Sequence, residues 1–206
     1  VPGETDYLGA GVHFCATCDG PFYKGKKVTV IGGGNSATEE SLLLTKFADR
    51  VVILVRGEQF TATQFIQEKV LGHEKIEVHW NTEVKEFQGA ESKLTQLKAV
   101  DNKTGAEEII PVDGVFIFIG QIPNTGFLVN SDVLLDRWGY IVTGHALTHL
   151  NPLHLYRKRE PHLLETSLPG VFAAGDVRDG STKQVVSAAG EGSTAALIIR
   201  EYLKTV

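Results

Sequence analysis

A short apolar segment that runs into a cluster of glycines limits what this chain can fold into more than any other feature. Positions 27–31 read Lys-Val-Thr-Val-Ile, and Gly32-Gly33-Gly34-Asn35-Ser36-Ala37 follows at once. A strand, then Gly-x-Gly-x-x-Ala, then a helix is typical of a dinucleotide-binding β-α-β unit. Gly32 allows the tight turn, Gly34 lets the backbone approach a pyrophosphate, and Ala37 allows close helix–strand packing. The alternative is an ordinary packing turn.

The residues after the glycines continue as a β-α-β unit. Positions 35–47 predict a helix, because Ala37 and a run of leucines supply its apolar positions. Positions 51–55 are apolar throughout, which is typical of a parallel strand buried on both faces. Positions 61–71 predict a second helix that ends before Gly72. This order predicts an α/β fold with a parallel sheet.

A β-rich segment then interrupts the pattern. Positions 76–110 favour strands, with a good turn at 102–105. Positions 115–119 form another apolar run that is expected to be buried. It ends in Ile119 and Gly120, which are candidate cofactor-binding residues. We therefore predict a Rossmann-like three-layer ββα nucleotide-binding domain over residues 23–120, with a meander inserted before its last strand.

The remaining residues predict a second, incomplete unit. Strands are expected at positions 140–142 and 171–174, and a helix at 184–203. The segment contains no complete β-α-β unit. Residues 121–206 are therefore expected to be the closing piece of a second domain whose opening piece is absent.

The cysteines form a single closely spaced pair. The chain has two, Cys15 and Cys18, within Cys-Ala-Thr-Cys-Asp-Gly. Half a zinc site is an alternative, but no second cysteine pair exists to complete a four-cysteine site. A single pair is no disulfide framework, which favours a catalytic dithiol in a reducing compartment, the cytoplasm. Asp19 is either a proton donor to a departing thiolate or simply the first residue of an Asp-Gly turn.

Two other residues follow strands that are expected to be buried. Arg56 stands where NAD-binding sites usually have an acidic residue, and an arginine there suits the 2′-phosphate of NADP. The alternative is a solvated surface arginine. Asp176, after Gly175, is either an acceptor for a cofactor hydroxyl or a cap of the turn. The residues themselves leave the role of Asp176 open.

Composition excludes several function classes. The net charge is −5 and no long basic run occurs, which argues against a nucleic-acid partner. No uninterrupted apolar span is long enough for a bilayer, and no signal peptide opens the chain. Four histidines lie between positions 145 and 162, but their spacing matches no standard metal site, so we expect a solvated loop and no metal.

Taken together, these residues resemble the low-molecular-weight thioredoxin reductases, which are class II pyridine nucleotide-disulfide oxidoreductases. The similarity runs nearly from end to end. It is carried by Val1-Pro2-Gly3-Glu4, by the segment 11–20 with its cysteines, by Gly32 to Ala37 with Glu39 and Glu40, by Asp113-Gly114-Val115-Phe116, by Gly120 with Pro123-Asn124-Thr125, by Gly139-Tyr140-Ile141, and by the segment 169–177.

The resemblance implies a flavin-dependent NADPH:disulfide oxidoreductase, active as a homodimer on thioredoxin or a similar protein disulfide. It implies that Cys18 faces the flavin, that Cys15 attacks the disulfide of the partner, and that Asp19 is the acid. Asp176, together with Gln184 and Val185 at a helix start, is implied to contact FAD. Residues 1–22 are implied to be a linker at the edge of the flavin domain, and 121–206 the C-terminal part of that domain.

The chain departs from the family pattern in three places. The family opens with its own FAD-binding glycine fingerprint, and this chain starts after it, so we expect weak FAD binding and no activity of the isolated chain. Of the arginine cluster for the 2′-phosphate, only Arg56 remains. Residues 149–162 form a longer connection, similar to that of extended flavoproteins of this kind.

Two other functions compete with this interpretation. One is an NADH-dependent, peroxiredoxin-reducing flavoprotein, against which Arg56 argues. The other is a nucleotide-binding or oligomerisation module without flavin chemistry, against which the intact cysteine pair argues.

Overall fold

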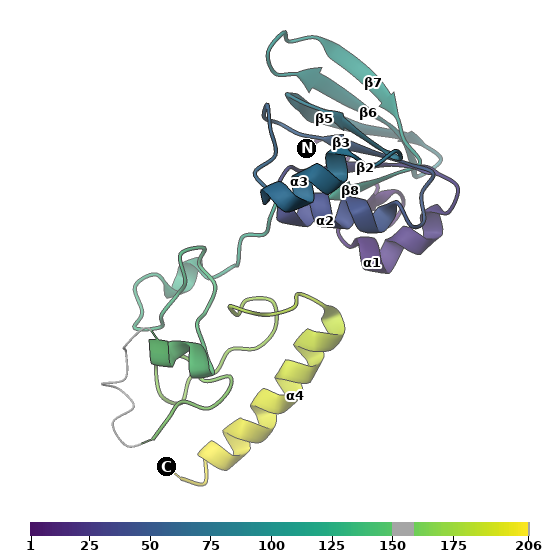
Figure 1. Cartoon of the computed structure of the whole chain (residues 1–206). Coiled ribbons are helices and arrows are strands. Elements are labelled where there is room, and N and C mark those ends of the chain that lie inside the picture. Colours follow the sequence, from purple (N-terminus) through teal and green to yellow (C-terminus); the bar gives the residue numbers. More distant parts are fainter. Residues whose placement is uncertain (150–158, 206) are drawn as a thin grey trace. The chain divides into compact units, whose positions relative to one another are not determined.

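The computed structural model describes residues 1–149 and 159–205. It divides into two compact units, Val1–Gly120 and Gln121–Val206 (Figure 1). The predicted mixed α/β fold with a parallel sheet is confirmed in the first unit. Val12–His13 pairs within that sheet, so the segment 1–22 packs as part of the first unit.

A five-stranded parallel sheet forms the centre of the first unit. Its strand order is β1-β8-β2-β3-β4. The strands are β1 (Val12–His13), β8 (Gly114–Ile117), β2 (Lys27–Ile31), β3 (Arg50–Leu54) and β4 (Ile76–His79). From β2 the chain moves through α2 to β3 on one side, whereas β8, on the other side, comes much later. The order of the strands therefore reverses beside β2, and in such sheets ligands bind at the carboxyl ends next to the reversal.

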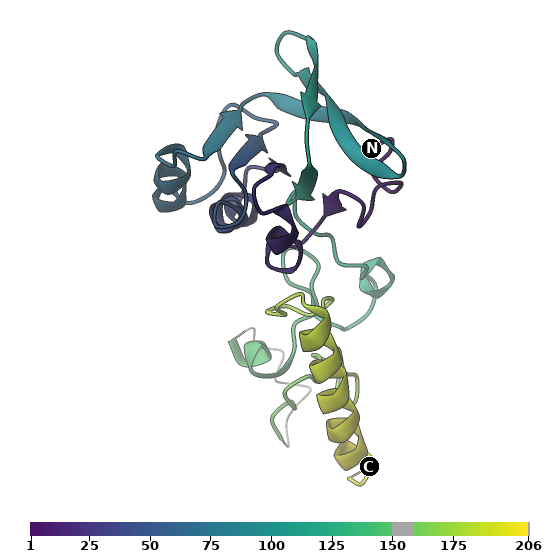
Figure 2. The same cartoon turned by 90° about the vertical axis from the view of Figure 1, so that its right-hand side faces the viewer.

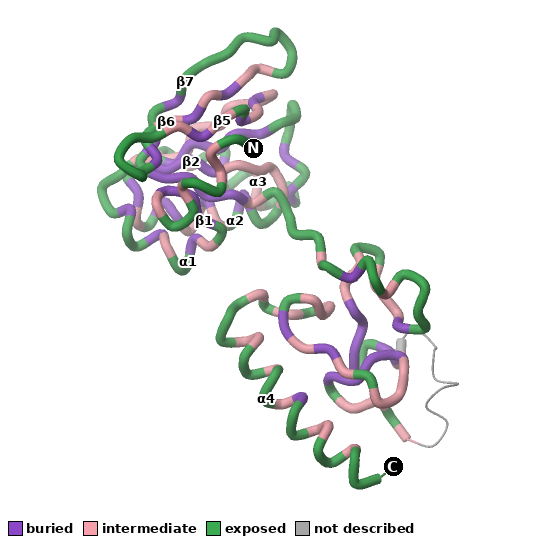
Figure 3. The backbone as a smooth tube through the Cα atoms, turned by 180° about the vertical axis from the view of Figure 1, so that it is seen from behind, coloured by how far each residue is buried: buried purple, intermediate pink, exposed green. Residues whose placement is uncertain are grey.

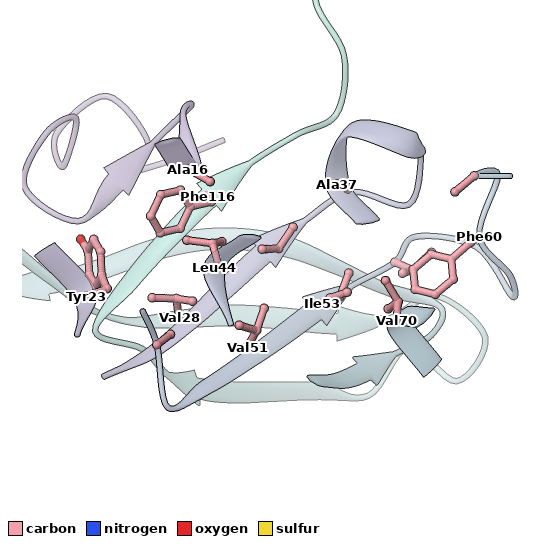
Figure 4. Packing of buried hydrophobic residues seen from close by; sticks show 14 residues of the cluster. Ala16, Tyr23, Val28, Ala37, Leu44, Val51, Ile53, Phe60, Val70 and Phe116 are labelled. Atoms are coloured by element: carbon pink, nitrogen blue, oxygen red, sulfur yellow. The ribbon is translucent and has the colours of Figure 1, made fainter. Parts of the chain in front are cut away.

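The side chains of β3 point alternately to the two faces of the sheet, and both faces are covered. Val51 and Ile53 pack with α2 and α3, whereas Val52 and Leu54 pack with the antiparallel sheet. Figures 1 and 2 show the helices on one face and β5 to β7 on the other. Figure 4 shows the helix-side cluster, in which Phe116, Leu44 and other fully buried side chains meet. The unit is therefore a three-layer ββα sandwich, with β2 and its glycine loop at the centre.

The helices of this unit are shorter than their sequence patterns predict. They are α1 (Ala16–Asp19), the 3-10 helix η1 (Gly20–Tyr23), α2 (Asn35–Leu44) and α3 (Gln64–Leu71). The helix after the glycines ends at Leu44 instead of position 47, because the next turn tightens, with Thr45 Oγ1 donating to the Leu42 carbonyl. The next helix begins at Gln64 instead of position 61, because the backbone N–H groups of Thr61 and Thr63 are held by the glycine loop.

The predicted meander is present. β5 (Thr82–Ala90), β6 (Lys93–Asp101) and β7 (Glu107–Pro111) form an antiparallel sheet before β8. The predicted turn at 102–105 joins β6 and β7. The expectation of a buried run to position 119 is wrong at its end. β8 stops at Ile117 and the Ile119 side chain is 72% exposed, because Phe118 donates the last backbone hydrogen bond back to β2.

The second unit has little regular sheet. It contains the 3-10 helices η2 (Gly126–Leu128) and η3 (Gly144–His149) and the long helix α4 (Val185–Tyr202). The strands expected at 140–142 and 171–174 are wrong. Ile141 and Phe172 form only isolated bridges, because the antiparallel backbone hydrogen bonds around them, to residues 134–136 and 164–166, continue for no more than three residues. Figure 3 shows α4 almost entirely exposed or half-buried; Ala195 is its one buried residue.

Nothing in the two described ranges, 1–149 and 159–205, is a helix long and apolar enough to cross a membrane.

Candidate functional site

The cysteine pair forms a disulfide at the start of α1. The two Cα atoms are 5.3 Å apart. Cys15 is the N-cap of the helix, and its sulfur accepts a hydrogen bond from the backbone N–H of Cys18 at 3.1 Å. The Cys18 residue is exposed and Cys15 is half-buried. The disulfide is therefore held by local backbone geometry and is open to a reaction partner.

Tight packing behind α1 fixes the disulfide relative to the sheet. Ala16 is fully buried in the helix-side core. A side chain at Gly20 would come within 3.0 Å of the Phe47 ring, so this position accommodates little more than hydrogen. Pro21 lies in the first turn of η1, where its fixed backbone angle suits a helical turn. The segment from Cys15 to Tyr23 thus sits close against the core of the first unit.

Asp19, the residue after Cys18, contacts a buried histidine, which in turn contacts a tyrosine. Its Oδ2 atom lies 3.3 Å from Nδ1 of His13, and Nε2 of His13 lies 2.6 Å from the Tyr23 hydroxyl. The His13 side chain is 9% exposed and that of Asp19 is 31% exposed. The imidazole also packs against the Phe116 ring, at 5.2 Å between centroids. A hydrogen-bonded chain thus connects Tyr23 to Asp19 through a buried histidine.

The protonation of this chain follows from its partners. Burial lowers the pKa of His13, although Asp19 acts in the opposite direction. Burial, with help from Asp19 and Asp113, raises the pKa of Tyr23 to about 12, so its hydroxyl keeps its proton. An ionised carboxylate only accepts hydrogen bonds, so neutral His13 carries its proton on Nδ1 and accepts from Tyr23 at Nε2.

The sequence did not point to His13 or Tyr23. Their contact depends on the pairing of β1 with β8 and on the turn of η1, and no local spacing rule encodes either. The one available signal was a histidine within an otherwise apolar strand just before Cys15.

The glycine loop has the shape of a phosphate cradle. Gly32 has φ of +142°, and a Cβ there would lie 2.4 Å from the Phe118 carbonyl oxygen. A Cβ on Gly34 would meet nothing closer than the Thr61 hydroxyl at 3.8 Å. Gly34 is the N-cap of α2, and no side chain caps the helix start. The N–H groups of the first turn are therefore available to an anion.

The connection between β3 and α3 forms hydrogen bonds with the glycine loop. Thr61 donates its backbone N–H to the Gly33 carbonyl at 2.8 Å, and Thr63 donates its own to Asn35 Oδ1 at 2.8 Å. Asn35 and Ser36 are exposed, whereas Ala37 is fully buried against the sheet. The loop is thus rigid on its core side and open on its other side.

Arg56 lies just past β3, at the same edge of the sheet as the glycine loop. It is exposed, and Asn102 donates its side-chain amide to the Arg56 carbonyl at 3.1 Å. Nearby, Lys103 pairs with Glu58. Gly120, with φ of +94°, and exposed Ile119 follow the end of β8. The first unit therefore brings the glycines, Arg56, Ile119 and Gly120 to the carboxyl edge of one sheet.

The other cofactor candidates lie in the second unit. Gly175 is buried with φ of +81°, and its N–H donates to Glu191 of α4 at 2.7 Å. Arg178 pairs with the same carboxylate at 2.6 Å, and its hydrogen bond lowers the pKa of Glu191. Asp176 is exposed beside this network. Gln184 is the N-cap of α4 without a side-chain cap bond, and Val185 is 86% exposed.

Within the described ranges, no group of three or more metal-binding side chains is placed to hold an ion. His154, Arg157 and Lys158 of the predicted solvated loop lie outside the described residues.

Comparison with known proteins agrees with these features. The family model of the pyridine nucleotide-disulphide oxidoreductases matches residues 1–192. The chain is 40% identical over 202 residues to the thioredoxin reductase of Listeria monocytogenes, and 40% identical over 206 residues to that of Treponema pallidum. These matches cover 98% and 100% of this chain. A crystal structure of thioredoxin reductase from Streptococcus pyogenes matches with a TM-score of 0.85 and 34% identity, over 100% of this chain and 61% of that chain.

The chain spans 58% of the Listeria relative and 61% of the Treponema relative. The resemblance to the thioredoxin reductases is therefore confirmed over nearly the whole of this chain, and over part of each relative. Because the family model covers residues 1–192, the chain belongs to the pyridine nucleotide-disulphide oxidoreductase family.

Proposed function

We propose that these residues carry the nicotinamide-binding and dithiol parts of a flavin-dependent NADPH:disulfide oxidoreductase of the thioredoxin reductase type. The observation that carries the proposal is the Cys15–Cys18 disulfide in the same compact unit as the strand–glycine–helix loop. We assign residues 23–120 to the NAD(P)H domain and residues 121–206 to part of the flavin domain. The whole protein would reduce thioredoxin or a similar protein disulfide.

The glycine loop fits the pyrophosphate of a nicotinamide dinucleotide. The space beside Gly34 and the uncapped first turn of α2 are what a close phosphate requires. Asn35 and Ser36 are exposed at the rim, and Ile119 and Gly120 would border the nicotinamide half. Arg56 would pair with the 2′-phosphate, which favours NADPH over NADH, although no second arginine follows it.

The second unit offers polar groups suited to part of FAD. Asp176 would accept hydrogen bonds from flavin-side hydroxyls, and Gln184 and Val185 stand at the start of α4, where backbone N–H groups would face FAD. Gly175 is held in place by Glu191, which fixes the turn that presents Asp176. Flavin, when bound, supplies two-electron transfer between a nicotinamide and a disulfide.

Cys15, Cys18 and Asp19 would carry out the sulfur chemistry and the proton transfer. Reduction of the Cys15–Cys18 disulfide takes up two electrons and breaks the S–S bond. Asp19 gives a proton to one departing thiolate, while the other thiolate remains for attack. Of the two, we assign Cys15 to attack on the partner disulfide and Cys18 to the flavin side. Such a dithiol works in a reducing compartment, so we propose that the protein is cytoplasmic. We also propose that it is a homodimer, as the resemblance to the thioredoxin reductases implies.

The test is steady-state NADPH oxidation coupled to reduction of thioredoxin by the full-length protein. Cys15→Ser and Cys18→Ser should each abolish turnover without weakening NADPH binding. Thr17→Ser, at an exposed position between them, should retain it. Turnover in either cysteine variant would overturn the proposal, and a preference for NADH would favour the peroxiredoxin-reducing alternative.

A further inference from the structure

We propose that His13 is a positioning residue that stores and supplies the proton of Asp19. The inference rests on the proposed function, in which Asp19 is the acid beside the dithiol. Its basis is the chain of contacts from Tyr23 through His13 to Asp19, at 2.6 Å and 3.3 Å. His13 contacts Asp19 directly and Tyr23 contacts His13, so we assign both to positions that act on the dithiol through Asp19.

The site is built to hold the imidazole in one orientation. Tyr23 is buried, and a Cβ at Gly114 would lie 2.2 Å from its ring, so glycine at 114 is what lets the tyrosine reach the histidine. The His13 ring lies edge-on to Tyr23 and tilted on Phe116. Fixed on two sides, the ring presents Nδ1 to Asp19 and Nε2 to Tyr23.

The histidine has access to solvent through a cavity. A space of about 280 Å³ is lined by His13, Asp19 and Tyr23, and also by Lys26, Lys93 and Asp113. These six include every titratable group that lines this space. The Tyr23 hydroxyl, which also lines this space, would pass its proton to Nε2 of His13 and take up another from solvent, while the Nδ1 proton passes to Asp19, so one proton moves in and one moves out.

The arrangement changes the pH range of the acid. An isolated carboxyl group loses its proton near pH 4, whereas histidine holds one to about pH 6.5. Burial lowers the pKa of His13, although Asp19 acts in the opposite direction, so His13 supplies protons at lower pH than an unperturbed histidine does. Proton supply to the thiolate therefore continues to a higher pH than Asp19 alone would allow.

The test uses the chain itself and needs neither nicotinamide nor flavin. A small dithiol, dithiothreitol, reduces the Cys15–Cys18 disulfide and is itself oxidised to its cyclic disulfide, so electrons and protons balance. The rate is measured against pH and corrected for the thiolate fraction of the reagent. At mildly acidic pH, where the proton supply from His13 is largest, we expect His13→Ala to slow reduction at least about 10-fold.

Two further variants separate proton supply from mere support of the fold. In His13→Asn the amide can still donate a hydrogen bond toward Asp19 but does not titrate and cannot relay a proton, so we expect it to be as slow as His13→Ala. Adding His13→Ala to Asp19→Asn should cause no further loss, because both act on one step. Lys24→Ala, at an exposed neighbouring position, should react at the unsubstituted rate.

Three results would overturn the proposal: normal rates in His13→Ala, normal rates in His13→Asn, or full additivity with Asp19→Asn. If the variants fail to fold, nitrogen NMR of the His13 imidazole in the unsubstituted chain tests the proposal instead. It should show neutral His13 with the proton on Nδ1, and a proton on Nε2 would contradict the chain of hydrogen bonds. NADPH-driven turnover can fail independently of these results, so the two proposals are tested separately.

Discussion

Among single residues, Gly32 and Gly34 are glycines for different reasons. Gly32 adopts a left-handed backbone against the Phe118 carbonyl, so it is needed for folding. Gly34 has an extended backbone, with φ of −88°, and open space where a side chain would stand. Among the described residues, the nearest atom to a Cβ at Gly34 would be the Thr61 hydroxyl at 3.8 Å, so glycine is not needed here to avoid a clash within the protein, and the space could serve a ligand.

Gly34→Ala should therefore leave the free energy of unfolding within about 0.5 kcal/mol of the unsubstituted value, while NADPH binding weakens at least tenfold. Calorimetric titration and urea unfolding of the same samples provide both numbers. Gly32→Ala is the contrasting control, since its Cβ would clash with Phe118 and should destabilise the fold. Unchanged NADPH affinity in a folded Gly34→Ala chain would count against the cradle.

Arg56→Ala should weaken NADPH binding about 10- to 150-fold, because a hydrogen bond to a charged group contributes about 1.5–3 kcal/mol. NADH, which has no 2′-phosphate, should bind as before. Lys46→Ala, at the opposite end of α2 from the glycine loop, controls for general loss of positive charge. Equal affinities for NADPH and NADH in the unsubstituted chain would refute the role of Arg56.

Local motifs allowed the sequence to identify some of these residues and not others. Cys15, Cys18 and Asp19 are adjacent or nearly so, and the glycine fingerprint is a contiguous pattern. His13 and Tyr23 are ten positions apart, and they meet only because β1 pairs with β8 while η1 turns back. Tertiary pairing of that kind leaves no periodic trace in the sequence.

At the scale of elements, the strands of the first unit were predictable and those of the second were not. Strand β2 has the predicted bounds, and β3 and β8 lie within a few residues of theirs. Each has a parallel neighbour over several residues. The apolar segment at 171–174 lacks such a neighbour among the described residues, and hydrophobicity alone does not make a strand.

A hydrogen-bonded, buried carboxylate lies within the second unit instead. Glu165 is fully buried and accepts hydrogen bonds from Arg159 and from the backbone N–H groups of His162 and Gly170. Burial alone would raise the pKa of Glu165, but these hydrogen bonds outweigh it and lower the pKa. The ionised form therefore belongs to the folded state.

Glu165→Leu should destabilise this unit by about 1–3 kcal/mol, because it leaves buried N–H groups without an acceptor. Since the folded pKa lies below the unfolded one, the stabilisation by Glu165 is present above about pH 5 and is lost as the pH falls further. Hydrogen exchange of the segment 164–173 in the whole chain measures both effects, with β2 as an internal reference. Equal protection of that segment in the variant at neutral pH would contradict this account.

At the scale of the whole molecule, the chain contains two compact units and covers 58–61% of its thioredoxin reductase relatives. Within the described residues, the polar groups that we propose for FAD are Asp176 and the start of α4. Each hydrogen bond makes a net contribution of about 1 kcal/mol, whereas the association of FAD with the chain costs about 4–15 kcal/mol of translational and rotational freedom.

We therefore expect the isolated chain, mixed with NADPH, free FAD and oxidised thioredoxin, to show no disulfide reduction above the blank. Absorbance of the purified chain should likewise lack a flavin band. Turnover that Cys18→Ser abolishes would show that these residues form a complete catalyst, contrary to this expectation.

The central claim is that electrons from NADPH arrive at Cys15 and Cys18 by way of a flavin. The most direct measurement is anaerobic: flavin-loaded full-length protein is mixed with NADPH in the absence of any acceptor, thiols are alkylated, and the labelled peptides are identified. We expect both cysteines to be labelled for each NADPH oxidised, and neither to be labelled when the flavin is removed. Oxidation of NADPH that leaves the Cys15–Cys18 disulfide intact would contradict it.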